Sequence, residues 1–294
     1  MQVSICFFIK YKELIYTAKK GKCFWPARSE RILLMKLIFF DIDGTLIDEN
    51  NNQMSDSTKE AINKARENGH ICIVNTGRSY KLVGDWLPKL VEFDGYLCGC
   101  GTHIIYNNKT LLHQTFTAEV ANQIIQGLEK YKIDAVLEGS DNNFHNNIDK
   151  IHTKLFKDFM LTFSNMNYGL YEDAIGRFDK FYCYAPEKWQ IEGFTKEFSH
   201  ILDFIDREKG FYEIAPKGFS KASAIKYIAN YLNIPMEETV AIGDSNNDLQ
   251  MLKCAHIAIA MGNGNDNVKG MADYVTTNVS EDGIKNALIW LNVI

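Results

Sequence analysis

The sequence predicts an α/β fold: a doubly wound, parallel-sheet (Rossmann-like) core with an inserted α+β cap domain. Short apolar runs such as 36–40 and 70–76 lack polar alternation, which is typical of parallel strands buried on both faces. Amphipathic helical segments separate these runs. The same strand-helix texture returns from residue 217, after a middle stretch of a different character, which indicates one sheet domain in two pieces.

The first part of the chain alternates strand and helix. In chain order we expect a strand at 36–40, a helix at 55–69, a strand at 70–76, a helix at 79–90 and two short strands within 93–107. Ser55 or Ser57 is the expected N-cap of the first helix, and Gly69 ends it. The second helix is expected to end near Pro88, because proline disrupts a helix interior.

The middle of the chain predicts a separate module. Helices are expected at 117–132 and 152–161, and short aromatic strands within 177–186 and 201–216. The aromatic side chains are interpreted as the core of this module rather than as a ligand cage. The second piece of the core then has helix 220–233, strand-loop-helix 239–252, strand 256–264, and a strand and terminal helix within 270–291. The expected domains are core 35–113, cap 114–212 and core 213–294.

Residues 1–34 are set apart as an N-terminal extension. The segment from Met35 reads like a natural protein start, so the extension is interpreted as a non-functional addition, with a small element packed on the core as the alternative. The apolar run 3–9 has no basic residue before it and no small-residue cleavage site after it. A signal peptide is therefore not expected.

Composition limits the kinds of partner. A net charge of −5 and 23% charged residues give no reason to expect nucleic-acid binding, and no apolar run reaches the roughly 18 residues of a membrane span. The seven cysteines are odd in number and irregular in spacing, as expected of reduced thiols in a cytoplasmic protein. Cys98 and Cys100 with nearby His103 suggest a metal site only weakly, because no second pair has zinc-ligand spacing. We expect a monomer or a weak homodimer.

Polar residues gather where the predicted strands end. The four groups are Asp41 with Asp43, the run Thr76-Gly77-Arg78, Lys221 at its helix start, and the stretch Asp244 to Asp248. In open α/β sheets, ligands bind beyond the carboxyl ends of the strands. The four groups are therefore expected to meet in one site. The last group taken alone also resembles part of a calcium-binding loop, but it lacks the glutamate at position 12.

Taken in order, "DIDGTL", "TGR", "SKASAI" and "GDSNND" resemble the four motifs of the haloacid dehalogenase-like superfamily. The large insertion between the second and third motifs resembles the Cof-type (IIB) phosphatase branch, which has an α/β cap. The resemblance runs from about Met35 to the end. It implies a magnesium-dependent phosphomonoesterase that hydrolyses small phosphorylated metabolites, sugar phosphates or phosphorylated cofactors, through an aspartyl-phosphate.

The resemblance also implies roles for the acids. Asp41 would be the nucleophile, ionised at neutral pH without a base to activate it. Asp43 would be the general acid and base, and like charges nearby would raise its pKa. Mg²⁺ would be held by Asp41, the backbone carbonyl of Asp43, Asp244 and waters.

The remaining residues would bind the phosphate. Thr76 and the amide of Gly77 are expected at a helix N-terminus, which suits phosphate oxygens. Lys221 would supply a full positive charge and Asn247 an amide donor. Asp248 would orient Lys221 or the metal shell. For Arg78, contact with the substrate and pairing with a neighbouring acid both stay open.

Two alternatives to a phosphomonoesterase follow from the same pattern. One is a phosphotransferase, such as a phosphohexomutase, on the same fold. The other is a non-catalytic regulatory protein that binds phosphate without turnover, although the presence of both Asp41 and Asp43 argues against it.

Overall fold

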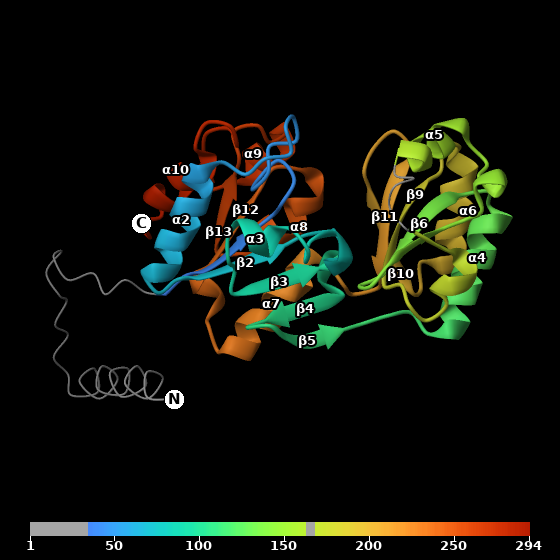
Figure 1. Ribbon diagram of the computed structural model, residues 1–294, viewed down its shortest axis with the longest axis horizontal. Helices are drawn as coiled ribbons and strands as arrows, with labels where there is room; N and C mark the ends of the chain where they lie inside the picture. Colours follow the sequence, from blue (N-terminus) through green and yellow to red (C-terminus); the bar gives the residue numbers. More distant parts are fainter. Residues whose placement is uncertain (1–34, 163–167) are drawn as a thin grey trace, which may run out of the picture. The chain divides into compact units, whose positions relative to one another are not determined.

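The computed structural model describes residues 35–162 and 168–294 of the chain. The expected extension at 1–34 lies outside the described residues. Within the described part, the strands form one eight-stranded and one six-stranded sheet (Figure 1). None of the described helices combines the length and the apolar character that crossing a bilayer requires.

The eight-stranded sheet has the strand order β14-β13-β12-β1-β2-β3-β4-β5. The strands from β14 to β3 are parallel, and β4 and β5 add an antiparallel edge. All four residues of β1 are buried, because β1 lies between β12 and β2 with both faces covered. The strands are β1 (Leu37–Phe40), β2 (Ile71–Asn75), β3 (Gly95–Cys98), β4 (His103–Tyr106), β5 (Lys109–His113), β12 (Thr239–Gly243), β13 (Ile257–Ala260) and β14 (Tyr274–Val275).

Helices cover both faces of this sheet. Ile38 and Phe40 of β1 pack toward α2 (Asp56–Glu67), α3 (Leu87–Leu90) and α10 (Gly283–Trp290). Leu37 and Phe39 point to the opposite face and pack with α7 (Lys221–Leu232), α8 (Leu249–Cys254) and α9 (Asp266–Met271). Figure 1 shows α2 and α10 side by side on their face. Successive side chains of a strand point to opposite faces of the sheet. Because helices cover both faces, consecutive residues of β1 are all apolar.

The six-stranded sheet belongs to the inserted module, with the order β10-β11-β9-β6-β7-β8. Helices α4 (Ala118–Lys130) and α6 (Lys188–Phe198) pack on one face, and α5 (Lys154–Thr162) contributes Phe156 and Met160 to the other. The strands are β6 (Asp134–Glu138), β7 (Asn143–His145), β8 (Gly169–Leu170), β9 (Lys180–Tyr184), β10 (Leu202–Asp206) and β11 (Phe211–Pro216). The aromatic side chains Phe144, Phe181 and Phe194 are fully buried in this module, as the sequence predicted.

The predicted fold class is confirmed, with local corrections. The single helix expected at 79–90 is wrong: the chain forms a 3-10 turn at Tyr80–Leu82 and a separate short helix from Leu87. Pro88 lies in the first turn of that helix rather than at its end, because the first turn tolerates a missing N–H. Strand β5 was not predicted. Strand β11 also extends past residue 212, where the end of the insertion was expected.

We expect Phe181→Ala to lower the free energy of unfolding by about 3–5 kcal/mol, because the ring is fully buried and its removal leaves a cavity. Chemical denaturation measures this change. Trp189→Ala, at a side chain that is 52% exposed in the same module, is the control and should shift stability by at most about 0.5 kcal/mol. Equal effects of the two substitutions would contradict the description of the module core.

Candidate active site

The carboxyl ends of three neighbouring strands bring the predicted site residues together. Phe40 pairs in register with Ile242 of β12 and with Val74 of β2, so the chain leaves all three strands at one level. Asp41 still follows this sheet, because its N–H donates to the carbonyl of Ile242 at 3.1 Å. Asp41, Asp43, Thr76, Gly77, Asp244 and Asn247 all line one cavity of about 260 Å³. The predicted convergence is therefore present.

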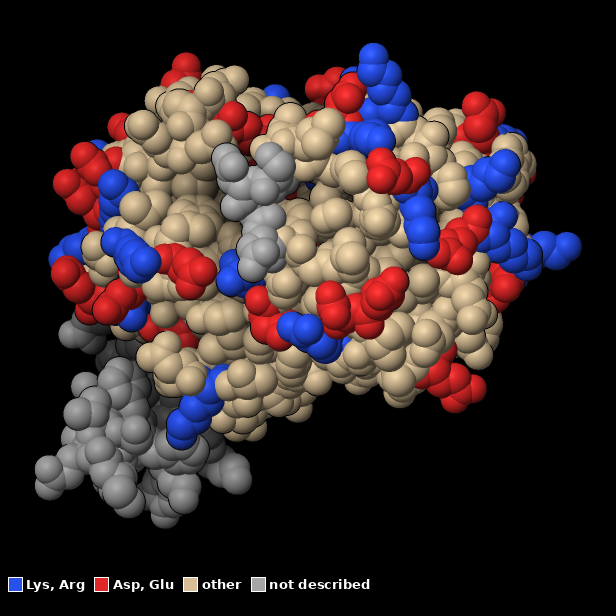
Figure 2. Space-filling model, turned by 45° about the vertical axis from the view of Figure 1, so that its right-hand side comes forward, with Lys and Arg blue, Asp and Glu red and all other residues tan. Residues whose placement is uncertain are grey.

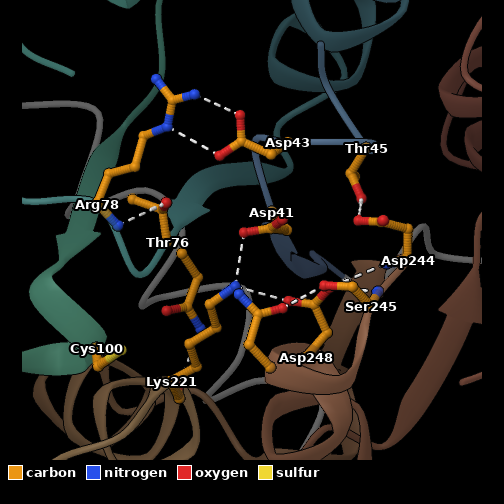
Figure 3. A network of polar contacts seen from close by, with 12 residues as sticks. Asp41, Asp43, Thr45, Thr76, Arg78, Cys100, Lys221, Asp244, Ser245 and Asp248 are labelled. Carbon is orange, nitrogen blue, oxygen red and sulfur yellow. Dashed lines mark hydrogen bonds and ion pairs between the residues drawn. The ribbon is translucent and has the colours of Figure 1, made fainter. Parts of the chain in front are cut away.

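Lys221 reaches this site through its contact with Asp41, which lines the cavity. Its ammonium lies 2.6 Å from Asp41 Oδ1 and 2.6 Å from Asp248 Oδ1, and all three side chains are at least 95% buried (Figure 3). The helix start that carries Lys221 is fixed by two contacts. Ser220 caps α7 by accepting from the Ser223 N–H, and the buried Asn75 amide donates to the Lys221 carbonyl at 3.0 Å. The ammonium is thus held at one place between two acids.

Asp244 and Asp248 are connected through the loop after β12. One Asp248 oxygen binds Lys221, and the other accepts the N–H groups of Asp244 and Ser245 at 3.0 and 3.1 Å. The hydroxyl of Thr45 donates to Asp244 Oδ1 at 3.1 Å. Gly44 has φ +74, and a Cβ there would collide with the Asp244 carboxylate, so only glycine fits this close approach.

The buried Asp41 and Asp248 and the half-buried Asp244 outnumber the single ammonium between them, and the pKa values of Asp41 and Asp244 are raised. Burial, then repulsion from Asp248, raises the pKa of Asp41 to about 7 despite Lys221. Burial, then repulsion from Asp248 and Asp41, raises the pKa of Asp244 to about 8. Burial alone would lower the pKa of Lys221, but Asp248 and Asp41 outweigh it and raise that pKa. Without a cation, the Asp41 carboxyl therefore holds its proton more readily than an ordinary aspartate does.

The same arrangement fits a hard divalent cation. One carboxylate oxygen from each of Asp41, Asp244 and Asp248 lies within 4.8 Å of the other two. Mg²⁺ takes carboxylate and other oxygen ligands, and the excess negative charge in this cluster is what a cation would balance. Asp41 and Asp244 were predicted as ligands. Both oxygens of Asp248 already accept hydrogen bonds, from Lys221 and from the Asp244 N–H. This geometry agrees with a residue that orients Lys221 and the loop that carries Asp244.

Asp43 has like charge nearby, since it repels Asp41, but its direct partner is Arg78. Its carboxylate accepts from Arg78 Nε at 2.8 Å and from Arg78 Nη2 as well, and it points toward Arg78 rather than toward Lys221 (Figure 3). Pairing with a neighbouring acid, one of the two options left open for Arg78, is thus the contact observed.

The expected helix N-terminus at Thr76 and Gly77 is absent. Among the described residues, the segment after β2 forms a loop and then only the three-residue turn at Tyr80–Leu82, so a helix dipole has no part here. Thr76 is anchored instead by its N–H, which donates to the carbonyl of Leu97 at 2.8 Å. Gly77 has a steric reason for being glycine, because a Cβ would lie 2.5 Å from Glu213 Oε1.

Side chains of the inserted module form the other wall of the cavity. Lys180 lies 2.7 Å from Glu213 and 3.2 Å from Glu138, and Arg207 lies 3.6 Å from Glu213. Burial would raise the pKa of Glu213, but Lys180 and Arg207 outweigh it and lower the pKa to about 2. Burial raises the pKa of Glu138, the more weakly paired acid. This wall therefore carries two acids and two cations in close balance.

These module residues were not predicted from the sequence. Lys180 and Tyr182 alternate along β9 with Phe181 and Cys183, which belong to the module core. This alternation is the sequence signal that could have assigned Lys180 and Tyr182 to the face of the strand that lines the cavity. Glu213 occupies a buried position of β11, which is unusual for an acid and marks a special site. The C-x-C pair with His103 does not form a metal cluster: among the described residues, the one group with metal-binding spacing is the three aspartates.

The chain matches the haloacid dehalogenase-like hydrolases over residues 38–288, and it belongs to this family. Similar curated proteins are phosphatases. One is the 5-amino-6-(5-phospho-D-ribitylamino)uracil phosphatase YitU of Bacillus subtilis, 26% identical over 86% of this chain and 96% of that protein. Another is the phosphoglycolate phosphatase of Methanobrevibacter smithii, 31% identical over 85% of this chain and 96% of that protein.

The solved structures agree with this family. The subclass IIB sugar phosphatase BT4131 is similar with a TM-score of 0.74 and 25% identity, over 88% of this chain and all of that chain. The predicted resemblance to the Cof-type (IIB) branch and the prediction of an enzyme are confirmed: the chain is a haloacid dehalogenase-like phosphatase.

The raised pKa values predict a stability that depends on pH. Because Asp244 titrates near 8 in the fold and at 3.8 ordinarily, the folded protein binds more protons than the unfolded chain between these values. The contribution of this group to stability is therefore lost as the pH rises through that window. Without divalent cations, Asp244→Asn and wild type should have the same melting temperature at about pH 4. At about pH 9, Asp244→Asn should melt at least about 3 °C higher than wild type.

Thermal unfolding measures this difference, and Asp149→Asn, at a carboxylate that is 86% exposed, is the matched control. Adding Mg²⁺ near about pH 8 should raise the melting temperature of wild type more than that of Asp244→Asn. Parallel pH profiles for wild type and Asp244→Asn would show that this carboxylate is not destabilised by its surroundings.

Proposed function

We propose that this phosphatase is a magnesium-dependent phosphomonoesterase that forms an aspartyl-phosphate on Asp41. The observation that carries the proposal is the buried contact of Asp41 with Lys221, at the edge of a cavity that Asp43, Thr76 and Asp244 also line. A carboxylate with one oxygen on an ammonium presents its other oxygen in a defined direction. This is what a nucleophile requires.

The proposed reaction has two steps. In the first, an Asp41 oxygen bonds to phosphorus while the bond from phosphorus to the leaving oxygen breaks, and Asp43, which must enter this step in its protonated form, gives that oxygen its proton. In the second, Asp43 takes a proton from water, the water oxygen bonds to phosphorus, and the bond to Asp41 breaks. Lys221 balances negative charge on Asp41 in both steps.

A bound Mg²⁺ ion, which Asp41, Asp244 and the Asp43 carbonyl would hold, would supply positive charge against both the phosphate and the clustered acids. Asp248 would keep Lys221 and the loop after β12 in place. Thr76, Gly77 and Asn247, on the wall of the cavity, would donate to the phosphate oxygens.

We propose that the inserted module is a cap that contacts the leaving group. Glu138, Lys180, Tyr182, Arg207 and Glu213 line the cavity together with the core acids. Two acids and two cations suit a leaving group that is neutral and rich in hydroxyl groups, and the volume of about 260 Å³ suits a small metabolite. Sugar phosphates and phosphorylated cofactors meet both conditions. Two of the relatives are named as phosphatases of a phosphoribityl compound and of phosphoglycolate.

We propose small phosphorylated molecules as the partners and the cytoplasm as the location. Acidic and basic side chains are interspersed on the face in Figure 2, which offers no broad basic area to a nucleic acid. The described cysteines are free, as in a reducing compartment. A monomer or weak homodimer remains our proposal for the assembly.

Asp41→Asn tests the function directly. With Mg²⁺ and p-nitrophenyl phosphate, the substitution should lower kcat at least about a thousandfold, because the amide cannot form the covalent intermediate. Asp149→Asn should keep wild-type turnover, since that carboxylate is exposed. Near wild-type turnover by Asp41→Asn would contradict the mechanism.

The assay also separates the alternatives. A phosphomonoesterase releases one inorganic phosphate for each sugar phosphate consumed, whereas a phosphohexomutase yields an isomer with its phosphate retained. Well-folded protein that turns over neither p-nitrophenyl phosphate nor any sugar phosphate would favour the binding protein.

A further inference from the structure

A second cavity adjoins the one that Asp41 and Asp244 line. Its volume is about 610 Å³, more than twice that of the first, and Arg78 and Leu82 line both cavities. The core contributes side chains from the segment 78–86 to this second cavity, and the inserted module contributes others, among them Tyr168. The first cavity therefore borders, at Arg78, a larger space that the same two parts of the chain line.

Aromatic and apolar side chains distinguish the second cavity from the first. Leu82 and Trp86 line it from the core, and Tyr168 lines it from the inserted module. Most residues that line the first cavity are charged or polar. Aromatic side chains bind planar conjugated rings by stacking, largely independently of the polar groups on the ring. The two cavities thus suit different parts of a molecule.

The Trp86 ring is held in one orientation. Its indole N–H donates to the Leu82 carbonyl at 2.7 Å, and the ring packs against the apolar core of the eight-stranded sheet. The Arg78 guanidinium carbon lies 5.9 Å from the centre of this ring, and a guanidinium is itself a planar group that stacks on aromatic rings. Because Trp86 is already ordered, a ligand that stacks on it immobilises little further.

The charges around the second cavity are largely paired. The charged residues that line it are Arg78, Lys81, Asp85, Asp141 and Arg177. Arg177 lies 2.7 Å from Asp141, and Arg78 donates to both oxygens of Asp43. Lys81 and Asp85 are then left, and they are of opposite sign. This balance favours an uncharged group in the second cavity over a second phosphate.

We propose that the second cavity binds a planar heteroaromatic ring at the far end of the substrate. The substrates are then phosphorylated compounds that carry such a ring, as nucleotides and many cofactor phosphates do, rather than simple sugar phosphates. The inference rests on the proposed function, and it goes further by choosing between the two substrate classes and by assigning specificity to Trp86. The phosphate lies at Asp41, and the ring lies against Trp86.

Two matched pairs of substrates test this proposal. Adenosine 5′-monophosphate and ribose 5-phosphate differ by a purine ring, and flavin mononucleotide and ribitol 5-phosphate differ by an isoalloxazine ring. A base that stacks on an aromatic side chain binds about 5–150-fold better. With Mg²⁺, kcat/KM for the ring-bearing member should therefore exceed that for its ring-free partner at least about tenfold in one or both pairs.

Trp86→Ala should lower kcat/KM for the preferred ring-bearing substrate at least about fivefold, and for its ring-free partner less than about twofold. Continued hydrolysis of the ring-free partner shows that this variant is folded. Trp86→Phe keeps an aromatic ring and should retain most of the preference. Trp189→Ala, at an exposed side chain that lines neither cavity, is the matched control and should leave both substrates unaffected.

Three results would overturn the assignment of the second cavity. They are hydrolysis of p-nitrophenyl phosphate with no preference for the ring in either pair, equal losses for both members of a pair in Trp86→Ala, and a sugar bisphosphate preferred over all four compounds. Wild-type protein that releases phosphate from none of the four compounds, and none from p-nitrophenyl phosphate, would instead overturn the proposed function on which the assignment rests.

Discussion

The rest of the site depends on one interaction, the pairing of the buried Lys221 ammonium with Asp41 and Asp248. A charge this deeply buried persists only when it is paired, and both acids lie at 2.6 Å from it. Asp41 directly follows β1, Asp248 lies in the loop region after β12, and Lys221 begins α7. The contact therefore joins three segments that are distant in sequence and fixes Asp41 at the cavity wall.

That contact leaves a charge imbalance which gives the site its chemistry. One ammonium cannot neutralise three carboxylates whose oxygens gather within 4.8 Å, and burial together with this repulsion raises the pKa values of Asp41 and Asp244. The sheet topology enforces the crowding, since adjacent parallel strands end at one level. A divalent cation is the simplest group that relieves it. In the proposed function, this cluster would be the cation-binding site.

Much of this was readable from the sequence, because local patterns encode it. Apolar runs gave the strands, and acids after the strand ends gave Asp41 and Asp244. What could not be read depends on contacts distant in the chain. The pairing of Arg78 with Asp43 spans 35 residues, and Glu213 reaches Gly77 from another sheet. The missing helix after Thr76 was hidden because its expected segment has acceptable helical spacing, interrupted only by Gly84 and Pro88.

Proton release on cation binding tests the central claim most directly. If Asp41 and Asp244 share excess negative charge in the folded protein, adding Mg²⁺ to weakly buffered protein near about pH 7 should release on the order of one proton per ion. The release should fall in Asp244→Asn and remain in Asp149→Asn. Saturable Mg²⁺ binding with no proton release, or a release that Asp244→Asn leaves unchanged, would contradict the account.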